Sequence, residues 1–555
     1  MRRLTPLLAC ALITGCAFID DFGKFEVDPA GADAGDAGRQ PDTGPPPPDS
    51  GRCGPETCNG EDDDCDGTTD EEPTECSFPN AVVGCVAGAC EMTGCVDGFG
   101  DCSAEAGCET ALSTSTNCGA CGTTCGWGEA CFDAACGQPP IAEALAIPSN
   151  MRSSIDEVVW EGDTRWVTFT FQGNANVFGR DLSSPRFTAG VLQLNPDDSV
   201  AWLELLDASG SSGVVGLERN PTGELYVAGS FAGTVTVGGT VYDASPARFA
   251  AYLWSLGSDG SARWFEAYPS TDSVSPSALA LADGTLTLVG SATGDFGALP
   301  NGGGDDAFVL RRDDSPTSLS LRYSGGSGSD RLRDAAIAAD GSFAIVGGAE
   351  GPATIIGATV SDPPTDGQQA FLGWNDDLDS SRWSVTTGND APDLAQTVAM
   401  DPSGNIYWTA QVGGDFDFGG GDTVAAAPFP TVIGSHTSAG VLRWTTQLRN
   451  VTPTSQVSTA ERVFVLGTFT DGDISEDGRV SHSGDRDGIL VALDASTGGV
   501  VWVRTWGGVG RETASSVMLD PAGGVWVTGG SDAPVMLETL YEPQGSDGYL
   551  FRVSN

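Results

Sequence analysis

One short acidic stretch holds the residues of this chain that are best suited to chemistry. Within Cys58 to Glu71 (CNGEDDDCDGTTDE), aspartates stand at alternate positions and a glycine follows them. This is the spacing of a calcium-binding loop, in which carboxylates supply hard oxygen ligands and the glycine permits a sharp turn. The residues predicted to hold the ion are Asp62, Asp64, Asp66, Thr68 through its backbone carbonyl, Asp70 and Glu71.

Calcium is the favoured occupant of this loop, and two alternatives stay open. Pro73 stands where an EF-hand carries its bidentate acid, so Glu71 or Glu72 would have to substitute for that acid. The first alternative is an acidic turn without an ion, clamped by disulfides. The second is copper, although residues 53–137 contain no histidine and bridged cysteines cannot bind a metal.

The same run closely resembles CxGxDxxCDGxxDE, a short metal-binding motif of secreted proteins from myxobacteria and related bacteria. The family is named after a copper-binding surface protein of methanotrophs, so the resemblance implies an exported protein with a metal site. Residues 98–125 resemble a second cysteine-rich repeat of myxobacterial surface proteins, through GCET at Gly107 and NCGACG at Asn117. This second resemblance implies no catalytic role.

Cysteines gather in residues 53–137, where 14 of the 16 lie. An even number at dense spacing predicts a disulfide framework of up to seven bridges in an exported chain. Few large apolar residues are present, so disulfides must replace a core. Structural zinc, bound through Cys118 and Cys121, is the alternative. The candidate bridging residues are Cys53, Cys58, Cys65, Cys76, Cys85, Cys90, Cys95, Cys102, Cys108, Cys118, Cys121, Cys125, Cys131 and Cys136.

The chain begins with features of export. A basic start and a short apolar run, predicted to be a signal peptide of residues 1–15, lead to Ile13-Thr14-Gly15-Cys16. These four residues resemble the lipobox of bacterial lipoproteins, which implies acylation of Cys16 and anchoring at the outer membrane or cell surface. The alternative is an ordinary signal peptide that contains a cysteine. Residues 16–52 are rich in proline, glycine and aspartate and predict an extended tether.

Residues 138–555 are repetitive and predict an all-β fold. Seven units recur every 57–63 residues, each with a turn and a strongly apolar strand, as in DPSG at Asp401 followed by NIYWTA. Four strands per unit without helical periodicity indicate a seven-bladed β-propeller, with a two-sheet sandwich or a β-solenoid as the alternative. In most units the fourth strand carries a tryptophan: Trp202, Trp264, Trp383, Trp444 and Trp502.

The last unit ends after its third strand, which leaves a ring one strand short. An open ring would expose a sheet edge, and propellers commonly close with a strand from the other end of the chain. The run from Ile141 to Ile147 is therefore predicted to pair beside Tyr549 to Val553.

Catalytic patterns are scarce in the repeats. MDPSGNIYWTA at Met400 and LDPAGGVWVTGGS at Leu519 resemble a bacterial propeller-repeat family defined by its fold, which implies no activity. ALDASTGGVVW at Ala492 fits the blade pattern of quinoprotein propellers once. The two histidines, His436 and His482, are predicted to lie in loops. Acid pairs such as Asp305-Asp306 and Asp485/Asp487 are predicted to be solvated loop charges.

Charge and motifs together favour a binding protein. The net charge of −50 argues against a nucleic-acid partner. The favoured function is a monomeric, non-catalytic binding or adhesion scaffold whose propeller loops bind a protein or polysaccharide, with calcium as the expected ion and no organic cofactor. The alternatives are a surface protein whose function is to bind calcium or copper, and an enzyme, quinoprotein-like or otherwise, that acts on extracellular polymers.

Overall fold

β-Strands make up every regular element in the part of the chain that the computed structural model describes. Within that part no helix has the length and apolar character needed to cross a membrane. The predicted signal peptide (1–15), Cys16 and the tether (16–52) lie outside it. The described residues are 53–71, 76–313, 319–360, 367–386, 392–413, 416–418, 423–424, 430–475, 478–533, 535–537 and 546–554.

The chain divides into two compact units. Among the described residues, one unit contains 53–71, Cys76 and Gly84–Glu91, and the other contains Ser77–Val83 and the residues from Met92 onward. Short hairpins fill residues 81–137, pairing successive strands two by two. These strands are β1 (Ala81–Val86), β2 (Ala89–Cys95), β3 (Phe99–Gly100), β4 (Thr110–Ala111), β5 (Ser113–Thr114), β6 (Asn117–Cys118), β7 (Ala130–Phe132) and β8 (Ala135–Gly137).

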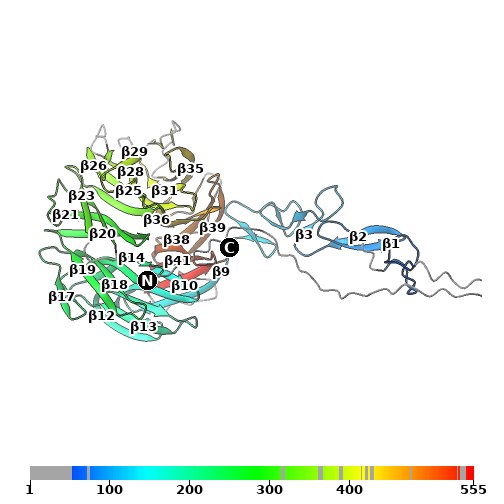
Figure 1. The fold of residues 1–555 in the computed structure, drawn as a ribbon, viewed down its shortest axis with the longest axis horizontal. Helices are drawn as coiled ribbons and strands as arrows, with labels where there is room; N and C mark the ends of the chain where they lie inside the picture. The colour runs from blue at the N-terminus through cyan, green and yellow to red at the C-terminus, as the bar shows by residue number, and fades with distance from the viewer. Residues whose placement is uncertain are drawn as a thin grey trace, which may run out of the picture. The chain divides into compact units, whose positions relative to one another are not determined.

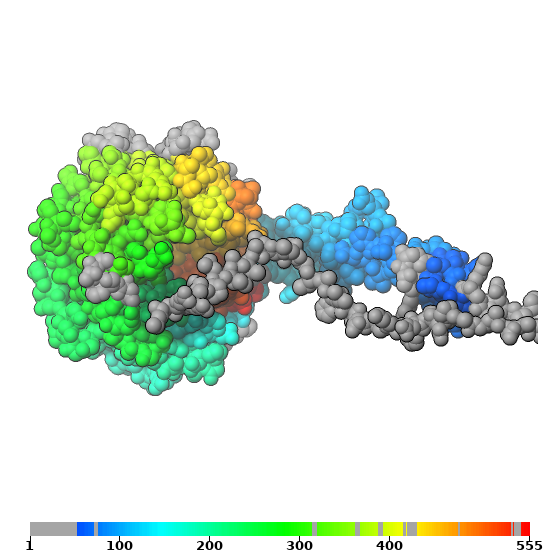
Figure 2. All heavy atoms as spheres, in the orientation of Figure 1, coloured from blue at the N-terminus to red at the C-terminus, as the bar shows by residue number. Residues whose placement is uncertain are grey.

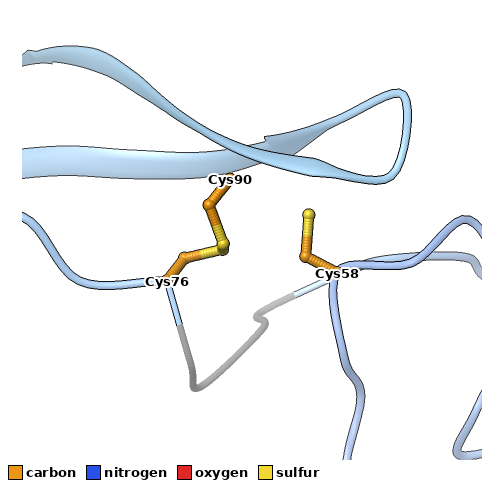
Figure 3. A group of neighbouring side chains, drawn as sticks. All are labelled: Cys58, Cys76 and Cys90. Carbon is orange, nitrogen blue, oxygen red and sulfur yellow. A yellow bond between two sulfur atoms is a disulfide. The ribbon is translucent and has the colours of Figure 1, made fainter.

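Seven disulfides cross-link this region and confirm its predicted disulfide-rich character. Most of them join cysteines fewer than 20 residues apart, so these bridges close short loops. Figure 3 shows the bridge between Cys76 and Cys90. The pairs are Cys53–Cys65, Cys58–Cys85, Cys76–Cys90, Cys95–Cys108, Cys102–Cys121, Cys118–Cys131 and Cys125–Cys136.

Residues 141–553 form a propeller-like series of antiparallel sheets, numbered here in chain order of their first strands. Sheet 1 contains β10 (Arg152–Glu161), β11 (Thr164–Val177), β12 (Arg180–Leu194) and β13 (Val200–Leu206). Sheet 2 contains β14 (Ser212–Arg219), β15 (Leu225–Phe231), β18 (Ala250–Leu256) and β19 (Ala262–Tyr268). Sheet 3 contains β20 (Ser273–Ala282), β21 (Thr285–Thr293), β22 (Asp305–Asp313) and β23 (Leu319–Ser324).

The later sheets repeat this up-and-down order. Sheet 4 contains β24 (Arg331–Ile337), β25 (Phe343–Glu350), β28 (Gln368–Asn375) and β29 (Ser381–Thr386). Sheet 5 contains β30 (Leu394–Met400), β31 (Ile406–Gln411), β34 (Thr431–His436) and β35 (Leu442–Leu448). Sheet 6 contains β36 (Val451–Ser458), β37 (Arg462–Phe469), β38 (Asp487–Asp494) and β39 (Val500–Gly508), with β42 (Val535–Met536) at its edge.

Sheet 7 combines both ends of this region. It contains β40 (Glu512–Leu519), β41 (Val525–Ser531), β43 (Ser546–Val553) and, as its fourth strand, β9 (Ile141–Ser149). β9 pairs antiparallel with β43, with Ala146 opposite Tyr549 and Ile141 opposite Val553. The predicted pairing of the 141–147 strand beside Tyr549 to Val553 is confirmed. A single pairing of Ser149 with Ala175 also joins β9 to sheet 1.

The first strands of the sheets contact one another in chain order, and β40 contacts β10 again. Figure 1 shows the sheets following one another from cyan through green and yellow to red, with β41 beside β10. The same colour order runs over the surface in Figure 2. The core lies between the sheets, because each apolar cluster joins side chains of two neighbouring sheets. This arrangement explains why the second and third strands are apolar on both faces.

The last turn before β7 packs against sheet 6. The Trp127 ring lies on Gly478 and leaves no room for a Cβ there. The Val503 N–H donates to the Gly128 carbonyl (2.8 Å). The Thr505 N–H donates to the Gln138 side chain (3.1 Å). The chain therefore contacts sheet 6 before it enters sheet 7.

Candidate functional site

A buried carboxylate shapes the acidic loop from within. Glu56 is 6% exposed. One of its oxygens accepts the Asp64 N–H (2.8 Å) and the other accepts the Asp70 N–H (3.1 Å). Glu56 therefore draws both ends of the loop around one centre. It precedes the motif, and the spacing of the motif does not single it out.

The structure brings the alternating aspartates together. Carboxylate oxygens of Asp62, Asp64 and Asp66 lie within 4.8 Å of one another. Asp62 and Asp64 both accept the Asp66 N–H (3.1 and 3.0 Å), and Asp62 also accepts the Gly67 N–H (3.1 Å). Gly67 has φ +98°, which matches the sharp turn predicted there. Three negative groups thus converge on the outside of the turn.

Glu71 joins this group from the other side. Carboxylate oxygens of Glu56, Asp64 and Glu71 lie within 4.8 Å of one another. Both Glu71 oxygens are shielded from solvent, and no described donor gives either of them a hydrogen bond. Their close polar neighbours are other carboxylates. Burying ionised groups without donors is costly, so the loop as a whole could hold a metal ion.

Thr68 and Asp70 have other hydrogen bonds in the loop. The Thr68 hydroxyl and N–H both donate to Asp66, and they hold the pKa of that exposed carboxyl below its usual range. Asp70 accepts the N–H groups of Asn59 and Gly60, both at 2.9 Å. Of the six predicted ligands, Asp62, Asp64 and Asp66 form one group of carboxylates, and Asp64 is also grouped with Glu71.

The donor set suits a hard cation and does not suit copper. Sulfur atoms of Cys58, Cys76 and Cys90 lie within 4.8 Å of one another and appear together in Figure 3. Cys76 is bonded to Cys90, and Cys58 is bonded to Cys85. No free thiolate is therefore present in this group. Carboxylate oxygens without thiolate or imidazole favour calcium over a soft metal.

A second concentration of charge lines a cavity of about 330 Å³ at the first strands of all the sheets. Each first strand has a register shift, and a residue at that shift lines the cavity. These residues are Asp156, Val215, Ser277, Arg333, Gln396, Thr454 and Ser515. The acidic side chains that follow them bind the next sheet. Glu157 accepts the Leu217 N–H (2.7 Å), and Asp334 accepts the Val398 N–H (2.9 Å).

These cavity carboxyls hold protons more tightly than free acids do. Burial raises the pKa of Asp156 to about 6 and that of Asp334 to about 7. Burial, together with the charges of Asp334 and Asp156, raises the pKa of Glu157 to about 8 against the opposing hydrogen bond from Leu217. The cavity is therefore only partly ionised near neutral pH.

Two predictions about titratable side chains were wrong. His436 lies in β34 and is fully buried, whereas a loop was predicted. Its Nδ1 accepts the Trp408 N–H (3.3 Å), its Nε2 faces the Phe418 carbonyl (3.0 Å), and burial lowers its pKa. Asp306 and Asp487 are 2% and 3% exposed, not solvated. Asp306 is the second residue of the third strand of its sheet, and Asp487 is the first residue of the third strand of its own.

Comparison with known proteins gives only distant likenesses in structure. No family model matches the chain, and no curated protein matches it. A structure of YCF48 bound to D1 peptide aligns with TM-score 0.37 and 10% identity over 75% of this chain and 97% of that one. The β-propeller domain of the Trilobed protease from Pyrococcus furiosus aligns with TM-score 0.36 and 8% identity, over 69% and 90%. A glucose dehydrogenase aligns with TM-score 0.31 and 9% identity, over 74% and 99%.

Proposed function

We propose that this protein is an exported, lipid-anchored scaffold at the outer membrane or cell surface, and that it binds a protein or polysaccharide without catalysing a reaction. The main observation behind this proposal is that the connections between the second and third strands differ from sheet to sheet, while the sheets themselves repeat. Hairpins β16–β17 (Thr234–Val237, Thr240–Asp243), β26–β27 (Ala353–Ile355, Ala358–Val360) and β32–β33 (Phe416–Asp417, Thr423–Val424) follow the second strands of sheets 2, 4 and 5. In sheet 3 the connection from β21 to β22 contains no such hairpin. Variable loops on a rigid frame are where binding specificity usually lies.

In this proposal residues 138–555 are one closed seven-bladed propeller. The contact of β40 with β10 and the pairing of β9 with β43 support this count. The lipobox-like Ile13-Thr14-Gly15-Cys16 supports the anchor, and residues 16–52 serve as the tether. The protein is expected to be a monomer, because β9 covers the edge that β43 would otherwise offer for self-association.

The test compares binding with turnover. The mature chain with Cys16→Ser is expected to stay out of the membrane fraction and to be soluble. Applied to an array of bacterial and plant glycans and to extracts of extracellular matrix, it should bind at least one component saturably. The bound polymer should be recovered unshortened. New reducing ends or other products would show that the protein is an enzyme and contradict the scaffold proposal. Sedimentation of the Cys16→Ser protein with carbonate-washed membranes would contradict the lipid anchor.

We further propose that the acidic loop binds calcium. The observation that favours it is Glu71, whose shielded oxygens face carboxylates and have no described donor. Glu56, Asp62, Asp64, Asp66 and Glu71 would surround the ion. Disulfides already fix the loop, so the ion is needed for charge neutralisation rather than for folding.

Isothermal titration tests this site. The mature chain should bind one calcium with a dissociation constant of about 10⁻⁴–10⁻³ M, as extracellular modules do. Glu71→Gln should weaken binding by about tenfold or more without unfolding the loop. Glu61→Gln removes the same charge from the same loop but lies outside the convergence, and should change little. Tighter binding of Cu²⁺, or no heat with calcium at millimolar concentration, would sink the calcium assignment.

A further inference from the structure

The fourth-strand tryptophans occupy one repeated position. In five sheets the third and fourth strands have a register shift near one end of their pairing. The tryptophan is the fourth-strand residue paired directly beside that shift. The Nε1 of Trp202 donates to the Ser258 carbonyl of sheet 2 at 3.0 Å. Trp383 and Trp444 make the same 3.0 Å bond to Ser438 and Ala495 of sheets 5 and 6. The indole thus fills the seam between two sheets.

The turn under three of these indoles contains a glycine. Gly260, Gly440 and Gly498 have φ near +80° (80°, 81° and 75°) and lie against the rings of Trp202, Trp383 and Trp444. A Cβ there would stand 2.5–2.9 Å from the ring. The indole and the glycine therefore form a matched pair at these seams.

Neither member of this pair is present where sheet 7 meets sheet 1. Glu143 of β9 takes the tryptophan position, paired with Arg552 just before the shift. Asp198, with φ 64°, takes the glycine position in a turn with the same backbone hydrogen bonds. Arg165 bridges them, with 2.9 Å between its Nη1 and Glu143 and an ion pair to Asp198.

A pocket of about 580 Å³ opens at this seam, whereas the fourth strand carries a tryptophan at five of the other six seams. The rings of Trp160 and Trp526 line it with centroids 5.8 Å apart and planes inclined by 45°. Asp520 is fixed by accepting the Trp526 N–H at 2.9 Å. Glu143 and Asp163 also line the pocket, and 41% of the Glu143 side chain is exposed.

We propose that this pocket binds a neutral hexopyranose unit of a polysaccharide. The half-buried Trp160 ring offers an apolar surface to the C–H face of a sugar, while Trp526 is buried beneath Arg165 and supports the pocket wall. Carboxylates and a guanidinium can pair with the sugar hydroxyls. The pocket is lined by three carboxylates and by two guanidiniums, those of Arg165 and Arg552. Its net negative charge disfavours an acidic sugar. The volume lies within the range of about 300–1,000 Å³ that is usual for small-molecule sites. The inference rests on the proposed binding function and names its site and ligand class.

The experiment titrates the mature Cys16→Ser chain with glucose, galactose, mannose and their trisaccharides, followed by tryptophan fluorescence and saturation-transfer NMR. At least one probe should bind saturably. The double variant Glu143→Trp/Asp198→Gly makes this seam like the others and should abolish binding. Trp160→Ala should weaken binding tenfold or more. Asp197→Asn, in the same turn but outside the pocket, should leave it unchanged. Thermal unfolding of each variant verifies its fold.

The outcomes separate this site from the wider function. Glycan binding that survives both pocket changes overturns the pocket while leaving the scaffold proposal intact. A folded wild-type chain that binds glycans on an array but none of the hexose probes also overturns it. Binding of a tryptophan-containing peptide, without binding of any sugar probe, overturns it too. A chain that binds neither glycans nor matrix components contradicts the scaffold proposal itself.

Discussion

Glu56 is the residue on which the shape of the acidic loop most depends. Both of its oxygens accept backbone N–H groups, and it is buried. In Glu56→Gln one acceptor becomes an amide donor, so one N–H loses its partner, at a cost of about 1–3 kcal/mol. We expect the amides of Asp64 and Asp70 to exchange with deuterium at least tenfold faster in this variant. Exchange as slow as in the Glu61→Gln control would contradict this role.

At this scale the sequence predicted which aspartates come together better than it predicted the residue that supports them. The spacing of Asp62, Asp64 and Asp66 alone indicated one face of a turn, and they converge. Glu56 was missed because its contact depends on the chain folding back over 8 and 14 residues. The burial of Asp306 and Asp487 was missed because it depends on the packing of neighbouring sheets, which local polarity does not reveal.

β9 is the element that closes the ring. Removing residues 141–147 would leave the N–H and C=O groups of β43 unpaired along one edge. We expect such a chain to associate or to unfold at a lower temperature, measured by light scattering after size exclusion and by calorimetry. A chain that lacks residues 30–50 should behave as the full-length protein. A monomeric, equally stable chain without 141–147 would show that closure is dispensable.

Strands were predictable where pattern and turn chemistry agreed. Apolar second strands after DPSG-like turns, as at Asp401, revealed the repeat. The last unit lacked a fourth strand, and this predicted that β9 supplies it. The hairpins β16–β17 and β26–β27 were not predicted, because their strands have only four and three residues each. Short, local pairs leave little periodicity to detect.

The whole ring should become less stable as pH rises above neutrality. Glu157 (pKa about 8), Asp334 and Glu512 (both about 7) are raised chiefly by burial. Between pH 6.5 and 9 the folded state therefore still holds protons that the unfolded chain has lost, so stability falls as these groups ionise. We expect a melting temperature lower by about 5 °C at pH 9 than at pH 6.5.

A paired substitution tests the cause of this pH dependence. Glu157→Gln with Asp334→Asn should flatten the dependence of the melting temperature on pH, whereas Asp197→Asn in an exposed turn should not. An unchanged slope in the double variant would assign the effect to other groups. The sequence could not predict this behaviour, because which first-strand residues face the cavity depends on where each register shift falls.

The contacts of Trp127, Gly128 and Gln138 with sheet 6 have a mechanical consequence. A pull applied to the chain before residue 126 reaches the Trp127–Gly478 contact and the Gly128–Val503 hydrogen bond first. Only after these yield does the load reach the β9–β43 ladder of sheet 7. Rupture under force depends on the rate of unfolding rather than on equilibrium stability. The contacts with sheet 6 therefore bear the load first and protect the closing strand until they fail.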